Sequence, residues 1–208
     1  MNHPPATAII LCGGASSRMG RDKASLPFGA ETLLERVIRL SRAAVDEVVL
    51  AAGASQAVPD GIPVIRDARE GLGPLSALAS AAAAVETEYV VLVACDTPLL
   101  QPALIRLLLD RARGWDACVP IVGGVLMTTC AVYRTQAVKA AAGPLLRAGS
   151  ASLRSLLAGL RTLYIDEPIL RQADPQLLSF TPCNTPAEYA QSLAMAGLAV
   201  NEPPTPAV

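Results

Sequence analysis

Two kinds of hydrophobic pattern alternate along this chain. The first is a short, continuously apolar run, seen most clearly at residues 89–94 (YVVLVA) and 7–12 (TAIILC). Such runs are typical of strands that are covered on both faces of a sheet. By the same pattern, further strands are predicted at residues 47–52, 63–66, 117–121, 128–133 and 162–166.

The second pattern is helical, with apolar residues recurring every three or four positions. It is clearest at residues 32–44, where Thr32 and Glu35 have the spacing of a capping box. Further helices are predicted at residues 73–85, 102–113, 135–142, 152–159 and 186–196. Because strands and helices alternate, the sequence predicts an α/β fold with a doubly wound sheet.

The whole chain of 208 residues is predicted to form a single domain (1–208), because no repeat or linker divides it. Residues 1–6 and 201–208 are expected to be loose tails. Hydrophobic residues make up 52% of the chain, which is enough for a large core. The chain has no apolar run of about 18 residues and no signal-peptide pattern, so we expect a soluble cytoplasmic protein without membrane contact.

Charge and cysteine content disfavour several classes of function. A net charge of −1 and an aromatic content of 3% argue against a nucleic-acid partner. The five cysteines are odd in number and lack C-x-x-C spacing, which disfavours a disulfide framework or a redox pair. A zinc site is disfavoured because the single histidine, His3, lies near the chain end.

A glycine-rich loop with three cations follows the first predicted strand. Gly13 and Gly14 let the backbone approach a ligand closely, and Arg18, Arg21 and Lys23 lie within six positions. This arrangement favours binding of a triphosphate, although the loop is neither a Walker A loop nor a dinucleotide-binding fingerprint. The alternative is a flexible connection whose charges are solvated.

Acidic residues follow two other predicted strands. Asp96 comes after the run at 89–94, and the carboxyl ends of parallel strands share one edge of a sheet. There its carboxylate can bind Mg²⁺ together with phosphate oxygens, or it can simply cap a helix. Asp67 can accept hydrogen bonds from a guanine edge or a ribose, or it can form a turn. These loops offer no covalent nucleophile with a nearby base.

Several segments together are similar to one known family. Segment 11–23 (LCGGASSRMGRDK) resembles the L-x-G-G-x-S-x-R-M-G-x-D-K signature of the molybdenum cofactor guanylyltransferases. VIRD with GLGPLSAL, VLVACDTPLL, ACVPIVGG and CNTPAEY resemble further segments, so the similarity covers roughly residues 7–196. It implies a Rossmann-like three-layer α/β/α nucleotidyltransferase fold with a mostly parallel sheet. The implied reaction is Mg²⁺-dependent transfer of GMP from GTP to the terminal phosphate of molybdopterin, with release of pyrophosphate and no covalent intermediate.

The same resemblance implies roles for individual residues. Arg18, Lys23 and Asp96 would be catalytic, with Asp96 as the Mg²⁺ ligand. Asn184 would face the pterin of the acceptor, although an Asn before Thr-Pro is by default part of a helix cap. Expected partners are GTP, molybdopterin and, transiently, molybdoenzymes or delivery proteins. The nucleotide would be lined by Leu11, Cys12, Gly13, Gly14, Lys23, Asp67, Gly73, Pro74 and Asp96.

The sequence departs from the family pattern at three places. Cys12 replaces a common alanine, and the two residues are close in size. Ala51 stands where relatives can carry a polar contact to the nucleotide, and residues 127–129 (MTT) replace a His-Pro stretch. The last departure concerns the acceptor side of the implied site.

Other functions stay open alongside the guanylyltransferase interpretation. One alternative is a cytidylyltransferase that acts on molybdopterin or on another phosphorylated acceptor. Others are a sugar-phosphate nucleotidyltransferase and a non-catalytic module for nucleotide binding or cofactor delivery. Gly13-Gly14 and Gly73-Pro74-Leu75 resemble the guanylyl branch more than the cytidylyl branch.

Overall fold

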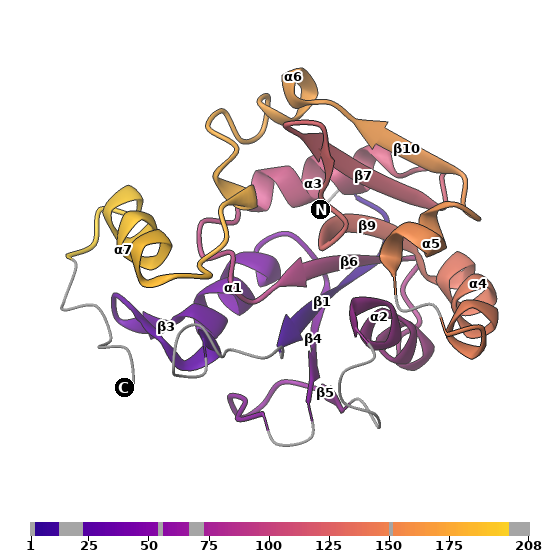
Figure 1. Cartoon of the computed structure of the whole chain (residues 1–208), viewed down its shortest axis with the longest axis horizontal. Coiled ribbons are helices and arrows are strands. Elements are labelled where there is room, and N and C mark those ends of the chain that lie inside the picture. The colour runs from indigo at the N-terminus through magenta and orange to yellow at the C-terminus, as the bar shows by residue number, and fades with distance from the viewer. Residues whose placement is uncertain (1–2, 13–22, 54–55, 67–72, 150–151, 200–208) are drawn as a thin grey trace.

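A single mixed sheet forms the centre of the computed structural model, which describes residues 3–12, 23–53, 56–66, 73–149 and 152–199 (Figure 1). The order of the eight strands found in these ranges is β10-β7-β9-β6-β1-β4-β5, with β8 paired to β7. The strands are β1 Ala6–Cys12, β4 Glu47–Ala52, β5 Val64–Arg66, β6 Tyr89–Ala94, β7 Ala117–Val122, β8 Val125–Leu126, β9 Cys130–Arg134 and β10 Thr162–Ile165.

Most neighbouring strands of this sheet run parallel. β1 pairs in parallel with both β4 and β6, and the same holds for β4 with β5 and for β7 with β10. β9 runs antiparallel between β6 and β7, and β8 is antiparallel to β7. The predicted mostly parallel sheet is therefore confirmed, with one reversed strand inside it.

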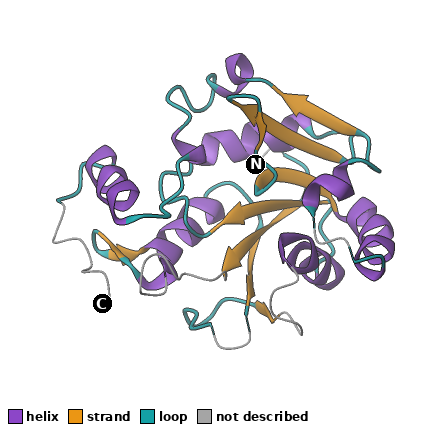
Figure 2. Ribbon diagram, viewed as in Figure 1, coloured by secondary structure: helices purple, strands orange, loops and turns teal. Residues whose placement is uncertain are grey.

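Helices cover both faces of the sheet and give the fold three layers (Figure 2). Side chains alternate between the faces, so Ile10 packs on the first face and Ile9 on the second. None of the helices in the described ranges is long and apolar enough to cross a membrane. The first face is covered by α1 Leu33–Arg42, α3 Pro102–Arg111 and α6 Glu167–Leu170, and the second by α2 Gly73–Ala84, α4 Thr135–Arg147 and α5 Leu153–Leu157.

A smaller hydrophobic cluster lies beside these layers and holds the last helix, α7 (Pro186–Met195). It joins α7 to a hairpin formed by β2 (Pro27–Phe28) and β3 (Glu31–Thr32). The rings of Phe28 and Tyr189 meet edge to face with centroids 6.4 Å apart, and the Tyr189 hydroxyl donates to the Pro27 carbonyl. The buried members of the cluster are Leu26, Phe28, Leu33, Leu99, Cys183, Tyr189 and Leu193.

Local sequence signals set several element bounds. The strand predicted at 89–94 has the same bounds in the structure. The capping box predicted for α1 is also present: Thr32 Oγ1 accepts the Glu35 N–H at 3.2 Å, and Glu35 Oε2 accepts the Thr32 N–H at 2.8 Å. These two signals act over only a few residues, so the sequence shows them directly.

Tertiary packing changes other bounds. α4 continues to Arg147 instead of ending at residue 142, with Pro144 inside it, because the following leucines pack against the core under α2 and α4. Ala6, which the sequence placed in a loose tail, begins β1 and is fully buried, and its N–H donates to Asp46 Oδ2 at 2.9 Å. α6 and the β2–β3 hairpin were not predicted, since each is too short to show a period. Residues 201–208 lie outside the described residues.

Candidate functional site

β1 and β6 end side by side at the carboxyl edge of the sheet because they are parallel neighbours. Leu11 lies opposite Ala94 in the register of these strands, and the Cys95 N–H donates to the Leu11 carbonyl at 3.1 Å. Asp96 therefore follows directly after the last ladder hydrogen bond. The Thr97 hydroxyl donates to the Ala94 carbonyl at 2.8 Å and closes the turn that presents Asp96. This edge is where α/β sheets bind ligands.

The Lys23 side chain lies beside Asp96 at the same edge. Lys23 begins the 3₁₀ turn η1 (Lys23–Ser25), whose first carbonyl accepts the Leu26 N–H at 3.1 Å. The Lys23 ammonium donates to Asn184 Oδ1 at 2.6 Å and lies 3.8 Å from Asp96 Oδ2. The Lys23 and Asp96 side chains are 19% and 21% exposed, so both are largely buried but still open to a ligand.

The environment of Asp96 disfavours its charged form. Burial raises the pKa of this carboxyl above its usual value, and the nearby Lys23 ammonium acts in the opposite direction. The Glu188 carboxylate raises the pKa of Asp96 as well, because two negative charges repel each other. A carboxylate in such surroundings gains stability when a cation binds to it.

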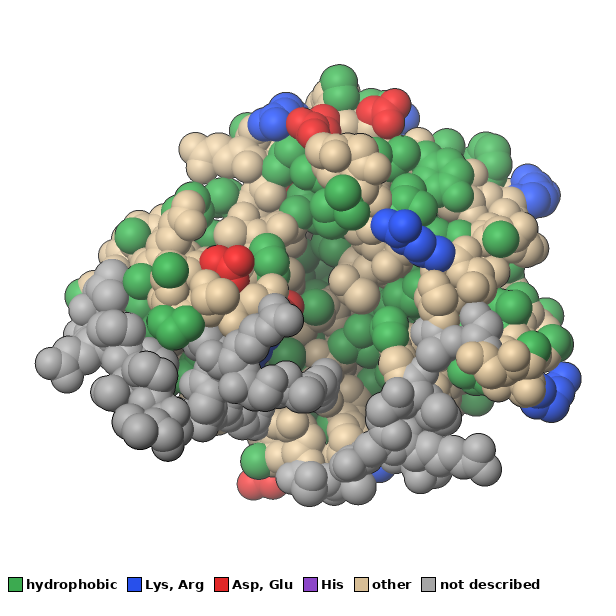
Figure 3. All heavy atoms as spheres, viewed as in Figure 1, with side chains coloured by type: hydrophobic (Ala, Val, Ile, Leu, Met, Phe, Trp, Pro, Cys, Tyr) green, Lys and Arg blue, Asp and Glu red, His purple; other side chains and the backbone are tan. Residues whose placement is uncertain are grey.

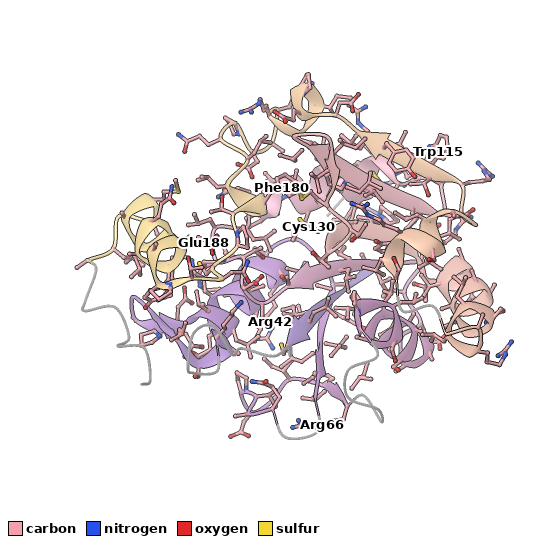
Figure 4. The ribbon with its side chains drawn as sticks, in the orientation of Figure 1. Arg42, Arg66, Trp115, Cys130, Phe180 and Glu188 are labelled. Carbon is pink, nitrogen blue, oxygen red and sulfur yellow. The ribbon has the colours of Figure 1, made fainter. Side chains whose placement is uncertain are left out.

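The C-terminal segment that carries Asn184 is tied to Asp96 through the backbone. The Cys183 N–H donates to the Asp96 carbonyl at 2.8 Å. The next residues begin α7, with Thr185 as N-cap and Glu188 as its capping-box partner. Figure 4 shows Glu188 on the side of α7 that faces the sheet. Glu188 was not among the candidate residues predicted from the sequence, although the T-x-x-E spacing from Thr185 is the signal of a capping box.

The structure brings three of the residues with implied roles together: Lys23, Asp96 and Asn184. Leu11 and Cys12 end β1 at the same edge, and Gly73 and Pro74 begin α2, where Gly73 has a positive φ of 77°. Asn184 contacts Lys23, and its implied contact with the acceptor stays a prediction. The remaining residues with implied roles, Gly13, Gly14, Arg18 and Asp67, lie outside the described residues.

Most of the described cysteines are unsuited to nucleophilic catalysis. Burial raises the pKa of Cys118 and Cys130 to about 12 and that of Cys183 to about 11. Since the thiolate is the reactive form, these three side chains stay inert near neutral pH.

On the face shown in Figure 3, charged side chains of both signs are scattered among hydrophobic ones and form no single patch.

Comparison with known proteins identifies relatives along nearly the whole chain. The family model described as the MobA-like NTP transferase domain matches residues 8–186. A molybdenum cofactor guanylyltransferase from Xanthomonas euvesicatoria pv. vesicatoria (strain 85-10) is 36% identical over 188 residues, which are 90% of this chain and 94% of that protein. The range matched by the family model includes Lys23, Asp96 and Asn184.

Solved structures share the fold. Molybdopterin-guanine dinucleotide biosynthesis protein A from Archaeoglobus fulgidus has a TM-score of 0.78 at 20% identity and covers 92% of this chain and 98% of its own. A Mycobacterium tuberculosis H37Rv protein in complex with manganese has a TM-score of 0.63 at 19% identity, with coverages of 92% and 98%. These structures confirm the predicted nucleotidyltransferase fold. By its sequence along nearly its whole length, this chain belongs to the molybdenum cofactor guanylyltransferase family of MobA-like NTP transferases.

Proposed function

We propose that this chain transfers GMP from GTP to the terminal phosphate of molybdopterin and releases pyrophosphate. Family membership makes the chain a nucleotidyltransferase, and the name of the Xanthomonas relative supports guanylyl transfer in molybdenum cofactor biosynthesis. The observation that carries the proposal is the meeting of Lys23, Asp96 and Asn184 at the carboxyl edge of the sheet. Hand-over of the product to molybdoenzymes or delivery proteins stays a prediction.

The first task of the site is to bind a triphosphate, and Lys23 suits it. An ammonium has three N–H donors, and Asn184 accepts one of them. Asp96 Oδ2 lies 3.8 Å away, beyond hydrogen-bond distance, so donors remain for phosphate oxygens. Because the closer partner is a neutral amide, the positive charge of Lys23 stays available to the nucleotide.

The Asp96 carboxylate is suited to bind Mg²⁺ together with oxygens of the substrate. Among the described residues, no three or more His, Cys, Asp or Glu side chains are arranged so that they could hold a metal ion by themselves. Mg²⁺ commonly binds through one or two carboxylates together with substrate phosphates and water. The manganese complex of the M. tuberculosis neighbour supports a divalent cation in this fold. When bound, Mg²⁺ would offset phosphate charge and polarise the phosphorus that is attacked.

The reaction exchanges one phosphorus–oxygen bond for another. An oxygen of the molybdopterin phosphate attacks the α-phosphorus of GTP, and the bond from that phosphorus to the bridging oxygen breaks. Pyrophosphate leaves with the electron pair, and the Lys23 ammonium offsets the charge that develops on it. Asn184 keeps that ammonium in place through its hydrogen bond.

The attacking group needs no strong base. A phosphate monoester has a second pKa of about 6, so its oxygens are already ionised at neutral pH. The lack of need for a strong base fits the position of the single histidine of the chain. His3 precedes β1, whereas the site lies where β1 ends, after Cys12. Positioning and charge neutralisation are therefore the main contributions of the protein to the rate.

The reaction is assigned to the cytoplasm. Cys95, Cys118, Cys130 and Cys183 are free thiols, three of them buried. Thiols stay reduced in the cytosol, whereas oxidising compartments favour disulfides.

A product assay tests the proposal. The purified chain is incubated with Mg²⁺, molybdopterin with or without molybdenum, and GTP, CTP or ATP in separate reactions, and the products are identified by mass. We expect a guanine dinucleotide and pyrophosphate with GTP only. A cytosine dinucleotide would retain the mechanism and overturn the choice of base. Tight GTP binding without any product would overturn the acceptor or the activity itself.

A further inference from the structure

The Glu188 carboxylate accepts one hydrogen bond more than the capping of helix α7 requires. Glu188 Oε2 accepts the N–H of the N-cap Thr185 at 2.9 Å, which is the ordinary capping-box bond. The same oxygen also accepts the N–H of Asn184 at 2.8 Å. Asn184 lies before the N-cap, outside the helix. One carboxylate oxygen thus caps α7 and also fixes the backbone of a residue in the site.

A second capping box in this chain shows what capping alone involves. At the start of α1, Glu35 Oε2 accepts the N–H of Thr32 at 2.8 Å and its hydroxyl at 2.9 Å. Both of these bonds go to the N-cap residue itself. Glu35 and Glu188 therefore share one structural role, and the bond to Asn184 distinguishes Glu188.

The Asn184 backbone matters because its side chain sets the position of the Lys23 ammonium. Asn184 Oδ1 lies 2.6 Å from Lys23 Nζ, whereas Asp96 Oδ2 lies 3.8 Å from it. Without the amide, the lysine could move closer to Asp96 and convert the present 3.8 Å ion pair into a hydrogen-bonded one. Such a pair would reduce the positive charge offered to phosphates and compete with a cation for the carboxylate.

Helix α7 has other anchors, so Glu188 is not needed to keep it in place. Tyr189 and Leu193 are buried in the cluster with Phe28 and Leu33, and the Tyr189 hydroxyl donates to the Pro27 carbonyl. Glu188 is the N3 partner of the capping box, and the N-cap Thr185 with its own hydrogen bond from the Glu188 N–H remains when the Glu188 carboxylate is removed. Removal of the Glu188 carboxylate is therefore expected to release the Asn184 backbone while α7 stays packed.

We propose that Glu188 is a positioning residue, which holds the Asn184 backbone so that the Asn184 amide keeps the Lys23 ammonium directed at the nucleotide phosphates. This inference rests on the proposed function, because it assumes that Lys23 binds the triphosphate. Glu188 itself contacts backbone N–H groups and touches no substrate in this scheme.

A double-mutant cycle on GTP affinity and turnover tests this role. The variants are Glu188→Ala, Asn184→Ala and the combination of the two, each measured for GTP affinity with Mg²⁺ by calorimetry and for kcat of dinucleotide formation. We expect each single variant to weaken GTP binding about tenfold, the size of one lost hydrogen bond to a charged group. The double variant should be no weaker than Asn184→Ala alone, because Glu188 acts through Asn184.

Two further variants separate positioning from stability. Glu188→Gln keeps an oxygen that can accept both N–H groups, so it should restore GTP affinity to within about threefold of the wild-type value. Glu35→Ala removes the matched cap of α1, and we expect it to lower the melting temperature about as much as Glu188→Ala does. Its GTP affinity and kcat should equal those of the wild type.

Three results would overturn the inference. The first is a double variant whose loss is the product of the two single losses, since Glu188 would then act independently of Asn184. The second is a loss of GTP affinity in Glu35→Ala equal to that in Glu188→Ala, which would reduce the effect to helix stability. The third is a Glu188→Ala chain with wild-type affinity and kcat. A wild-type chain that binds GTP but makes no guanine dinucleotide would instead overturn the proposed function, and the affinity cycle would still test Glu188.

Discussion

Lys23 and Asn184 are 161 residues apart in the sequence, and a hydrogen bond of 2.6 Å joins their side chains. Lys23 precedes the β2–β3 hairpin, and Asn184 precedes α7, which packs on that hairpin. The contact is thus produced by the small hydrophobic cluster beside the sheet.

Removal of the Lys23 ammonium should impair catalysis far more than folding. We expect Lys23→Ala to lower kcat by about 100-fold, the size found when one preorganised charge or donor is removed from a transition state. The measurement is pyrophosphate release at saturating GTP and Mg²⁺. Lys139, the other lysine of the chain, is the matched control. Its ammonium donates to the Val85 carbonyl and pairs with Glu86, away from the Lys23 site. Equal losses in Lys23→Ala and Lys139→Ala would contradict the assignment.

The Asp96 carboxylate should be required for metal-dependent turnover. Asp96→Asn keeps the shape of the side chain and removes its charge, so we expect kcat to fall by about 100-fold or more, without recovery at higher Mg²⁺ concentration. A titration of turnover against Mg²⁺ measures both effects. Asp110→Asn, which affects an exposed carboxylate near Arg113, serves as the control and should behave as wild type. Wild-type turnover in Asp96→Asn would remove Asp96 from the metal site.

The buried cysteines should resist alkylation in the folded protein. Because burial raises the pKa of Cys118 and Cys130 to about 12 and that of Cys183 to about 11, few thiolates form at pH 8. Cys95 is only partly buried, so we expect iodoacetamide to label it first. Peptide mass spectrometry of native and urea-unfolded samples gives the comparison. Rapid labelling of Cys130 in the native sample would show that its surroundings open.

Acid should weaken the fold partly through Glu31. The hydrogen bond from Arg39 lowers the pKa of Glu31 below its usual 4.5, against a smaller rise caused by burial, and Arg36 lowers it further. A lowered folded-state pKa means that the ionised form stabilises the fold, fully above pH about 4.5 and progressively less as the pH falls through the folded pKa. Glu31→Gln should therefore be less stable than wild type at pH 7, by at most about 1 kcal/mol because Arg39 is exposed.

The measurement for Glu31 is urea unfolding at pH 7 and at pH 3. The difference between wild type and Glu31→Gln should shrink at pH 3, because below pH about 4.5 the unfolded chain binds a proton more readily than the folded Glu31 carboxyl does. Glu86→Gln is the control, since Glu86 is 89% exposed and its partner Lys139 also donates to a backbone carbonyl. A Glu31 difference that stays constant between the two pH values would show that its charge does not contribute.

The sequence predicts those parts of this protein that depend on local patterns. The strand at 89–94 and the cap at Thr32 follow from periodicity and from hydrogen bonds within a few residues. The position of Asp96 after a buried strand and that of Lys23 in a glycine-rich loop with two further cations were enough to mark both as candidates, and the resemblance added the role of Asn184.

Long-range relationships could not be predicted in this way. A strand pattern does not state its neighbours, so the reversed direction of β9 between β6 and β7 was not visible. A proline normally signals the end of a helix, but α4 continues past Pro144 because Leu145 and Leu146 pack against the core. The hydrogen bond between Lys23 and Asn184 likewise depends on how α7 packs, which no local spacing encodes.

The position of α7 also determines when during protein synthesis the site becomes complete. All strands of the described sheet precede α7 in the chain, so a nascent polypeptide can form the sheet, with Lys23 and Asp96 at its edge, before Asn184 has left the ribosome. The lysine gains its amide partner only when α7 emerges and docks on the hairpin. The order of synthesis therefore makes the hydrogen bond between Lys23 and Asn184 one of the last contacts of the site to form. A chain truncated before α7 would contain all strands of the described sheet but lack this hydrogen bond.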